Sequence, residues 1–188
     1  MVYKENLIFK GDDFQLQELA RGEYENCTFT DCNFANTNLS GLIFIDCAFV
    51  CCDMSMAVLG QTSFRDAKFR DCKLLGMHFN NCSKFLLSMQ FEDSVLNFSS
   101  FYQVSLKKAW FSGCNLQEVD FVESNLGQTS FLNCDFFRAM FNNTVLEGAD
   151  LSTSYNFSIN PSNNRIKKAK FSRENVMGLL EGFGIIIE

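Results

Sequence analysis

A five-residue period runs through most of the chain and constrains its fold more than any other feature. Every fifth residue from Phe14 to Phe79 is large and apolar, and so is every fifth residue from Leu86 to Leu151. The first series is Phe14, Leu19, Tyr24, Phe29, Phe34, Leu39, Phe44, Phe49, Met54, Leu59, Phe64, Phe69, Leu74 and Phe79. The second series is Leu86, Phe91, Leu96, Phe101, Leu106, Phe111, Leu116, Phe121, Leu126, Phe131, Phe136, Phe141, Leu146 and Leu151. Chance does not produce such runs in a chain that is 47% apolar, so the sequence predicts a repeat architecture.

Small side chains occupy the position two residues before most of these apolar centres. Seven of the nine cysteines fall there: Cys27, Cys32, Cys47, Cys52, Cys72, Cys114 and Cys134. Units such as Cys32-Asn33-Phe34 and Ala149-Asp150-Leu151 match the A(D/N)LXX consensus of the pentapeptide-repeat family. Residues 12 to 153 therefore resemble that family. The resemblance implies an all-β fold, a right-handed quadrilateral β-helix, in which each unit forms one side of a square coil with its centre and small residue pointing inward.

A twenty-residue period is also visible, because residues twenty apart share a side-chain type. Phe29, Phe49 and Phe69 form one such column, and Leu106, Leu126 and Leu146 form another. Coils stacked like strands lie about 4.8 Å apart, so identical side chains can pack as ladders, each burial stabilising the fold by roughly 1.5 to 3 kcal/mol. The predicted core is a one-dimensional stack in which each coil contacts only its neighbours.

The spacing divides a single solenoid domain, residues 1–188, into segments. We predict a capping strand in 1–11, coil blocks in 12–79 and 86–153, and a C-terminal cap and dimerisation tail in 154–188. Phe79 and Leu86 are seven residues apart, so 80–85 is either a joint or a tolerated bulge. The context Phe79-Asn-Asn-Cys-Ser resembles the point where Qnr-type fluoroquinolone-resistance proteins interrupt their solenoid, which favours a joint.

The tail predicts a short C-terminal α-helix followed by an apolar strand. Ser172 is a plausible N-cap, Glu174 lies in the first turn, and Gly182 is a natural stop. Such a tail resembles the dimerising C-terminus of Qnr-type and mycobacterial gyrase-protecting proteins, which implies a homodimer; the alternative is a cap on the chain's own stack. The candidate dimerisation residues are Val176, Met177, Leu179, Leu180, Phe183, Ile185, Ile186 and Ile187.

Residue types that support catalysis or metal binding are scarce. The cysteines follow the repeat register, which predicts buried small hydrophobes rather than zinc ligands or disulfides. The single histidine, His78, should face outward without a paired nucleophile. We therefore expect no enzyme activity, no cofactor and no metal. With no bilayer-spanning run and no signal peptide, we expect a cytoplasmic protein without membrane contact.

The net charge of −6 argues against nucleic-acid binding. Resemblance to the Qnr-type proteins implies a rod that imitates DNA and occupies the DNA-binding saddle of DNA gyrase or topoisomerase IV. The candidate partner-binding residues are the acidic residues of the second block, Asp93, Asp120, Glu123, Asp135, Glu147 and Asp150. Regular spacing leaves no room for the long loops that Qnr-type members project. Two alternatives stay open: a scaffold or regulatory protein that binds an unrelated partner through its flat faces, and a purely structural element.

Overall fold

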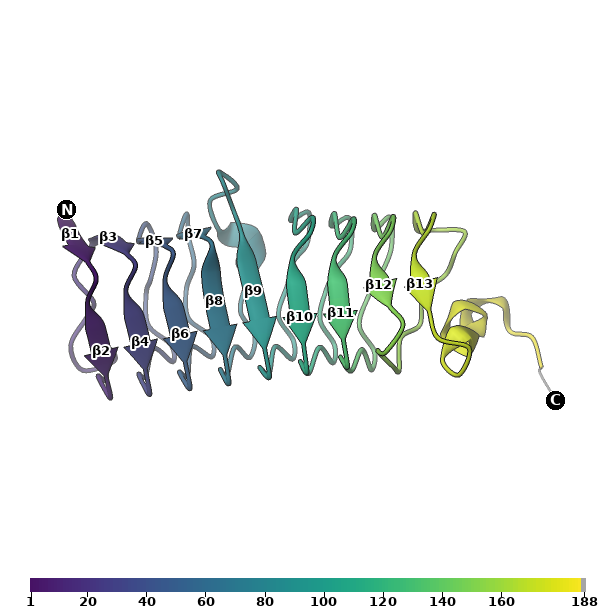
Figure 1. The fold of residues 1–188 in the computed structure, drawn as a ribbon, viewed down its shortest axis with the longest axis horizontal. Helices are drawn as coiled ribbons and strands as arrows, with labels where there is room; N and C mark the ends of the chain where they lie inside the picture. The colour runs from purple at the N-terminus through teal and green to yellow at the C-terminus, as the bar shows by residue number, and fades with distance from the viewer. Residues whose placement is uncertain (187–188) are drawn as a thin grey trace.

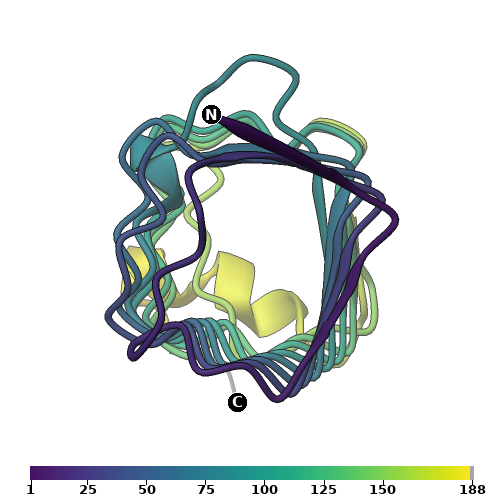
Figure 2. The ribbon, with the colours of Figure 1, turned by 90° about the vertical axis from the view of Figure 1, so that its left-hand side faces the viewer.

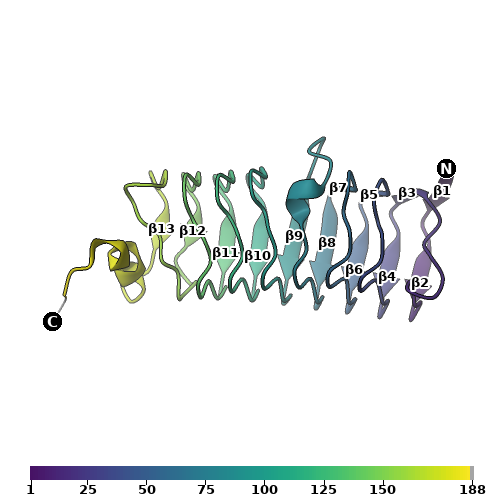
Figure 3. The same cartoon turned by 180° about the vertical axis from the view of Figure 1, so that it is seen from behind.

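A computed structural model describes residues 1–186 and shows a rod of stacked square coils (Figures 1 and 2). The two termini lie at opposite ends of the rod, as the rear view also shows (Figure 3). All strand pairing is parallel in the described part of the chain, and partners are twenty residues apart except across one insertion. The predicted all-β solenoid is confirmed.

Two sheets and two columns of isolated bridges form the four sides of the square, which we call faces A, B, C and D in chain order. Face A is a nine-stranded sheet of β2 (Ile8–Lys10), β4 (Thr28–Thr30), β6 (Ala48–Val50), β8 (Ala67–Arg70), β9 (Met89–Glu92), β10 (Trp110–Ser112), β11 (Ser130–Leu132), β12 (Asp150–Leu151) and β13 (Lys170–Phe171). Face D begins as a four-stranded sheet of β1 (Val2–Glu5), β3 (Gly22–Glu25), β5 (Ile43–Ile45) and β7 (Ser63–Arg65). The expected N-terminal strand is thus split between β1 and β2.

Single bridges align the coils on the other faces. Face B follows the column Asp13, Asn33, Asp53, Lys73, Val95, Asn115, Asp135 and Tyr155. Face C includes the column His78, Ser100, Asp120 and Met140, and face D continues through Ser105, Asn125, Val145 and Arg165. A corner residue is assigned to the side of the square that precedes it in the chain.

Ladders of identical side chains fill the interior, as predicted. On face A the ring centroids of Phe29, Phe49 and Phe69 follow one another at 5.0 Å with nearly parallel planes. Rings on adjoining faces meet edge to face, as do Phe44 and Phe49 at 5.3 Å. These offset and edge contacts are the geometries that aromatic rings prefer, so the ladders give the rod a continuous core.

The polar groups of the small inward residues form hydrogen bonds with backbone carbonyls. The Thr62 hydroxyl donates to the Leu39 carbonyl at 2.8 Å, and the Cys52 thiol donates to the Phe29 carbonyl at 3.3 Å. Burial raises the pKa of the Cys47 thiol to about 12, so this group stays protonated at neutral pH. The seven cysteines in the repeat register are all buried, in agreement with the prediction that they act as small inward side chains.

The joint absorbs its two extra residues on face D. A 3-10 turn, η1 (Phe79–Asn81), precedes a loop that projects from the square outline (Figure 2). Face A continues past it, because Ala67 of β8 pairs with Met89 of β9. The prediction that Leu86 belongs to a core ladder is wrong, since its side chain is 64% exposed. Leu87 packs partly against the core instead.

The predicted C-terminal α-helix is also wrong. The tail forms two 3-10 turns, η2 (Val176–Leu179) and η3 (Glu181–Phe183), which lie across the end of the stack (Figures 1 and 2). Gly178 lies so close to the chain that a β-carbon there would be 1.9 Å from the Phe157 carbonyl oxygen. The Gly178 carbonyl accepts a hydrogen bond from the Ile159 amide at 2.9 Å. Docking on the last coil therefore occupies the Gly178 carbonyl, which in an α-helix would accept a hydrogen bond from an amide of the same helix. The Ser172 hydroxyl still accepts a hydrogen bond from the Asn175 amide, at 3.1 Å.

Candidate interaction surfaces

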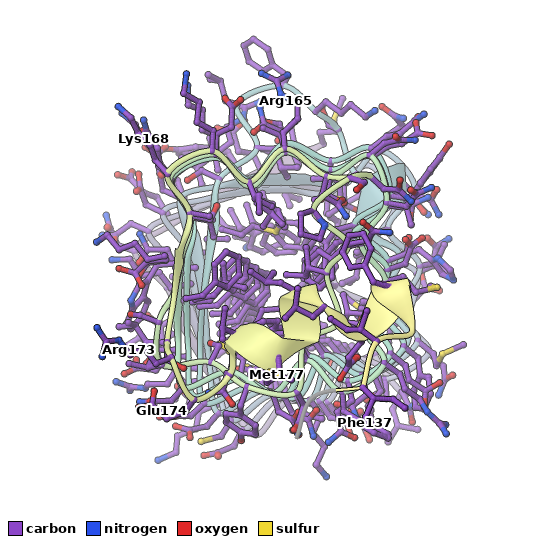
Figure 4. All side chains as sticks on the ribbon, turned by 90° about the vertical axis from the view of Figure 1, so that its right-hand side faces the viewer. Phe137, Arg165, Lys168, Arg173, Glu174 and Met177 are labelled. Atoms are coloured by element: carbon purple, nitrogen blue, oxygen red, sulfur yellow. The ribbon has the colours of Figure 1, made fainter. Side chains whose placement is uncertain are left out.

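Charge is distributed unequally over the four faces. Faces B and C together carry eight carboxylates and three cations: Asp12, Asp13, Glu18, Asp53, Glu118, Asp120, Glu123 and Asp135 against Arg21, Lys73 and Arg138. The C-terminal half of face D is basic, with Lys84, Lys107, Lys108, Arg165, Lys167 and Lys168 against Glu147. Figure 4 shows Arg165 and Lys168 on the side of the square opposite Phe137, which belongs to face B. The rod thus presents an acidic pair of faces and a separate basic patch.

The six predicted partner-binding carboxylates do not form one site. Asp93 and Asp150 lie on face A and Glu147 lies on face D. The other three lie on the two acidic faces: Asp135 on face B, Asp120 on the adjoining face C, and Glu123 at the corner that ends face C. The acidic block that is contiguous in sequence is therefore wrapped around the rod.

Carboxylates on faces B and C also hold the coils in place. Asp120 accepts hydrogen bonds from the Val122 amide at 2.9 Å and from the Ser100 hydroxyl at 3.2 Å. Asp135 accepts from the Gln117 side-chain amide at 2.7 Å, in the coil before it. These donors are neutral, so the contacts place no compensating cation beside either carboxylate.

Two of the remaining carboxylates are paired with cations of the next coil. Glu147 lies 3.0 Å from the Arg165 guanidinium, and Asp150 lies 3.0 Å from the Lys170 ammonium. The pKa of Asp150 is lowered, first by hydrogen bonds from Ser152 and then by Lys170. Their negative charge is largely compensated within the rod.

Exposed apolar side chains gather where faces B and C meet, a surface we call the B/C corner. They are Met56, Val58, Phe98, Phe137 and Met140. The sequence did not identify this cluster, because its members come from separate coils. Glu118, at the same corner, was also missed as a candidate. The twenty-residue register could have identified both.

The tail residues divide into a buried and an exposed set. Leu179 packs against the core, and Leu180 is half-buried. The exposed residues are Val176, Met177, Phe183, Ile185 and Ile186. Met177 lies at the end of the stack in Figure 4. Ile187 lies outside the described residues.

Residues 1–186 hold no cluster of three or more His, Cys, Asp or Glu side chains placed to bind a metal ion. His78 is exposed on face C. In the same range, no helix has the length and apolarity needed to cross a bilayer.

Comparison with known proteins identifies the repeat. A family model of the pentapeptide repeat region matches residues 23–97, and a model of eight pentapeptide repeats matches residues 114–152, together more than half of the chain. No curated protein sequence matches. A trypsin-treated form of QnrB1, a plasmid-mediated fluoroquinolone resistance protein, is similar at 20% identity and a TM-score of 0.68, covering 100% of this chain and 92% of QnrB1. A second trypsin-treated form is similar at 21% identity and a TM-score of 0.52, covering 100% of each chain. At this identity the likeness concerns the fold. The repeat models, the square coil and its ladders agree: the chain belongs to the pentapeptide-repeat family.

Proposed function

We propose that this protein is a non-enzymatic, cytoplasmic interaction module that binds a type II topoisomerase, DNA gyrase or topoisomerase IV, as a partial mimic of duplex DNA. The acidic pair of faces B and C on a straight rod carries the proposal. A groove that binds DNA is basic, so these faces complement it in charge. The family fold, shared with a protein named for fluoroquinolone resistance, is compatible with this role.

The charge density limits how closely the rod imitates DNA. Duplex DNA carries roughly 21 negative charges over the ~36 Å that seven to eight coils span. This chain has a net charge of −6 in total, and part of its surface is basic. We therefore expect weak, salt-sensitive inhibition of gyrase supercoiling. Strong fluoroquinolone protection is not expected, because the coil spacing has no room for long loops away from the joint.

Three of the candidate carboxylates are proposed to carry the contact: Asp120, Glu123 and Asp135. They lie on the acidic faces and have no cation within ion-pair distance among the described residues. The test is gyrase supercoiling at low salt with the purified protein in excess. The triple variant Asp120→Asn, Glu123→Gln, Asp135→Asn should weaken inhibition about tenfold, at several tenths of a kcal/mol per charge.

The matched control removes the same number of charges elsewhere, through Asp93→Asn, Glu147→Gln and Asp150→Asn. It should inhibit nearly as well as the unmodified protein. If the unmodified protein leaves both topoisomerases unaffected at low salt, the mimic is abandoned.

The alternative function is a scaffold or regulatory protein for an unrelated partner. The basic half of face D favours it, because Phe85 and Leu86 are exposed there next to Lys84 in the chain. Such a contact would join an apolar anchor to a basic surface and would suit an acidic protein. Mutation of Phe85 and Leu86 to Ser would abolish that contact and leave gyrase inhibition intact.

Homodimerisation through the tail is part of the proposal. The tail offers exposed apolar groups beyond those that cap the stack, as Met177 and Phe183 illustrate. Joining two tails would cover them and lengthen the acidic rod.

A further inference from the structure

The apolar side chains of the B/C corner occur in every second coil. Met56 and Val58 belong to one coil, Phe98 to the coil two further on, and Phe137 and Met140 to the coil two beyond that. Two coils separate such positions by about 10 Å. The coils between them present Gly76 and His78, then Glu118 and Asp120. The corner is therefore an evenly spaced row of apolar groups with polar groups between them.

Met56 and Phe98 occupy corner positions of their coils, where the backbone is left-handed at many points along the rod. Met56 has φ 58° and Phe98 has φ 63°, both in the left-handed region. Asn, Asp and Gly adopt that conformation most readily, and Asn36 occupies the same column of the corner with φ 59°. Met56 and Phe98 are 57% and 59% exposed, so neither side chain contributes much to the core. Large apolar side chains left exposed at two corners of the same edge point to a binding role.

Acidic groups flank the row. Glu118 and Asp120 lie between the apolar groups, and Asp53 and Asp135 lie on the adjoining face B. The nearby Arg138 guanidinium lies over the Phe137 ring, 5.0 Å from its centroid, and so covers part of an apolar face. The corner fits a partner that offers cations together with apolar side chains at a spacing of about 10 Å.

We propose that the B/C corner is the contact edge of the rod and that Phe98 and Met56 are its apolar anchors in the basic DNA-binding groove of the topoisomerase. This inference rests on the proposed function. The carboxylates supply attraction that weakens with salt, whereas the anchors supply contact that does not.

The test replaces Phe98 and Met56 with Asn, which suits the left-handed backbone, so the fold is retained and the melting temperature does not fall. The control is Leu86→Asn, because Leu86 is 64% exposed, has φ 53° and lies on face D. Affinity for purified gyrase is measured by calorimetry at several salt concentrations. The double variant should bind at least tenfold more weakly at every concentration with an unchanged salt dependence, and the control should bind normally.

A second pair, Val58→Ser and Met140→Ser, tests the same row at neighbouring positions and should also weaken binding. If the unmodified protein binds gyrase and both pairs bind within twofold of it, the corner proposal is overturned and the proposed function stands. If the unmodified protein binds neither gyrase nor topoisomerase IV, both are overturned.

Discussion

Phe111 shows how much one ring contributes to the core. It is fully buried and stacks between Phe91 at 4.8 Å and Phe131 at 5.0 Å. We expect Phe111→Ala to lower the free energy of unfolding by about 3 to 5 kcal/mol, because ladder neighbours on both sides prevent the cavity from collapsing. Urea denaturation measures this. A loss below about 1 kcal/mol would contradict the inward register.

Asp150 gives the fold a dependence on acid pH. Its folded pKa is lowered from 3.8 by Ser152 and Lys170, so its contribution to stability is present above that pH and is lost as pH falls below it. Asp150→Asn should therefore reduce the melting temperature at pH 7 and have little effect near pH 2. Equal reductions at both values would show that the carboxylate charge is not involved.

At the scale of elements, the tail depends on one close approach. Gly178→Ala places a β-carbon against the Phe157 carbonyl, and we expect it to detach η2 and lower stability by about 1 to 3 kcal/mol. Gly182→Ala is the control, since its nearest neighbour, the Asn160 side chain, would be 3.4 Å away. Limited proteolysis should release the tail of the first variant earlier than that of the second. Equal rates would mean that the glycine contact does not hold the tail.

Elements set by the repeat could be predicted, and those set by docking could not. The five-residue spacing identifies nearly every buried centre, because only one register puts the large residues inside. Leu86 is an exception, because the two extra residues of the joint form a loop that projects from the coil and leaves the Leu86 side chain exposed. The tail was misread because Ser172 and Glu174 are good local helix signals, whereas the Gly178 contact with Phe157 depends on where the last coil ends.

For the whole molecule, the tail dimer gives a direct prediction. Sedimentation at micromolar concentration should show a dimer, and Val176→Asp with Met177→Asp should give a monomer, because charges replace exposed apolar side chains. Both substitutions lie outside the buried cap, so the melting temperature of the rod should change little. A monomeric unmodified protein would leave the tail as a cap alone.

The candidate surface was predictable in composition but not in arrangement. The sequence shows an acidic second block, yet Arg165 and Lys170 compensate Glu147 and Asp150 only because the next coil places them alongside. The B/C corner likewise requires the register of several coils at once. Met56 and Phe98 lie in different coils, so only the stacked structure shows that they share an edge.

The stacked coil also bears on how such a chain can change in evolution. Each coil contacts only its neighbours, and partners in the second block are twenty residues apart. An in-frame duplication of one coil there would lengthen the rod by about 4.8 Å while leaving every other contact unchanged. The length of the rod can therefore change in steps of one coil. The number of side chains along each edge changes with it.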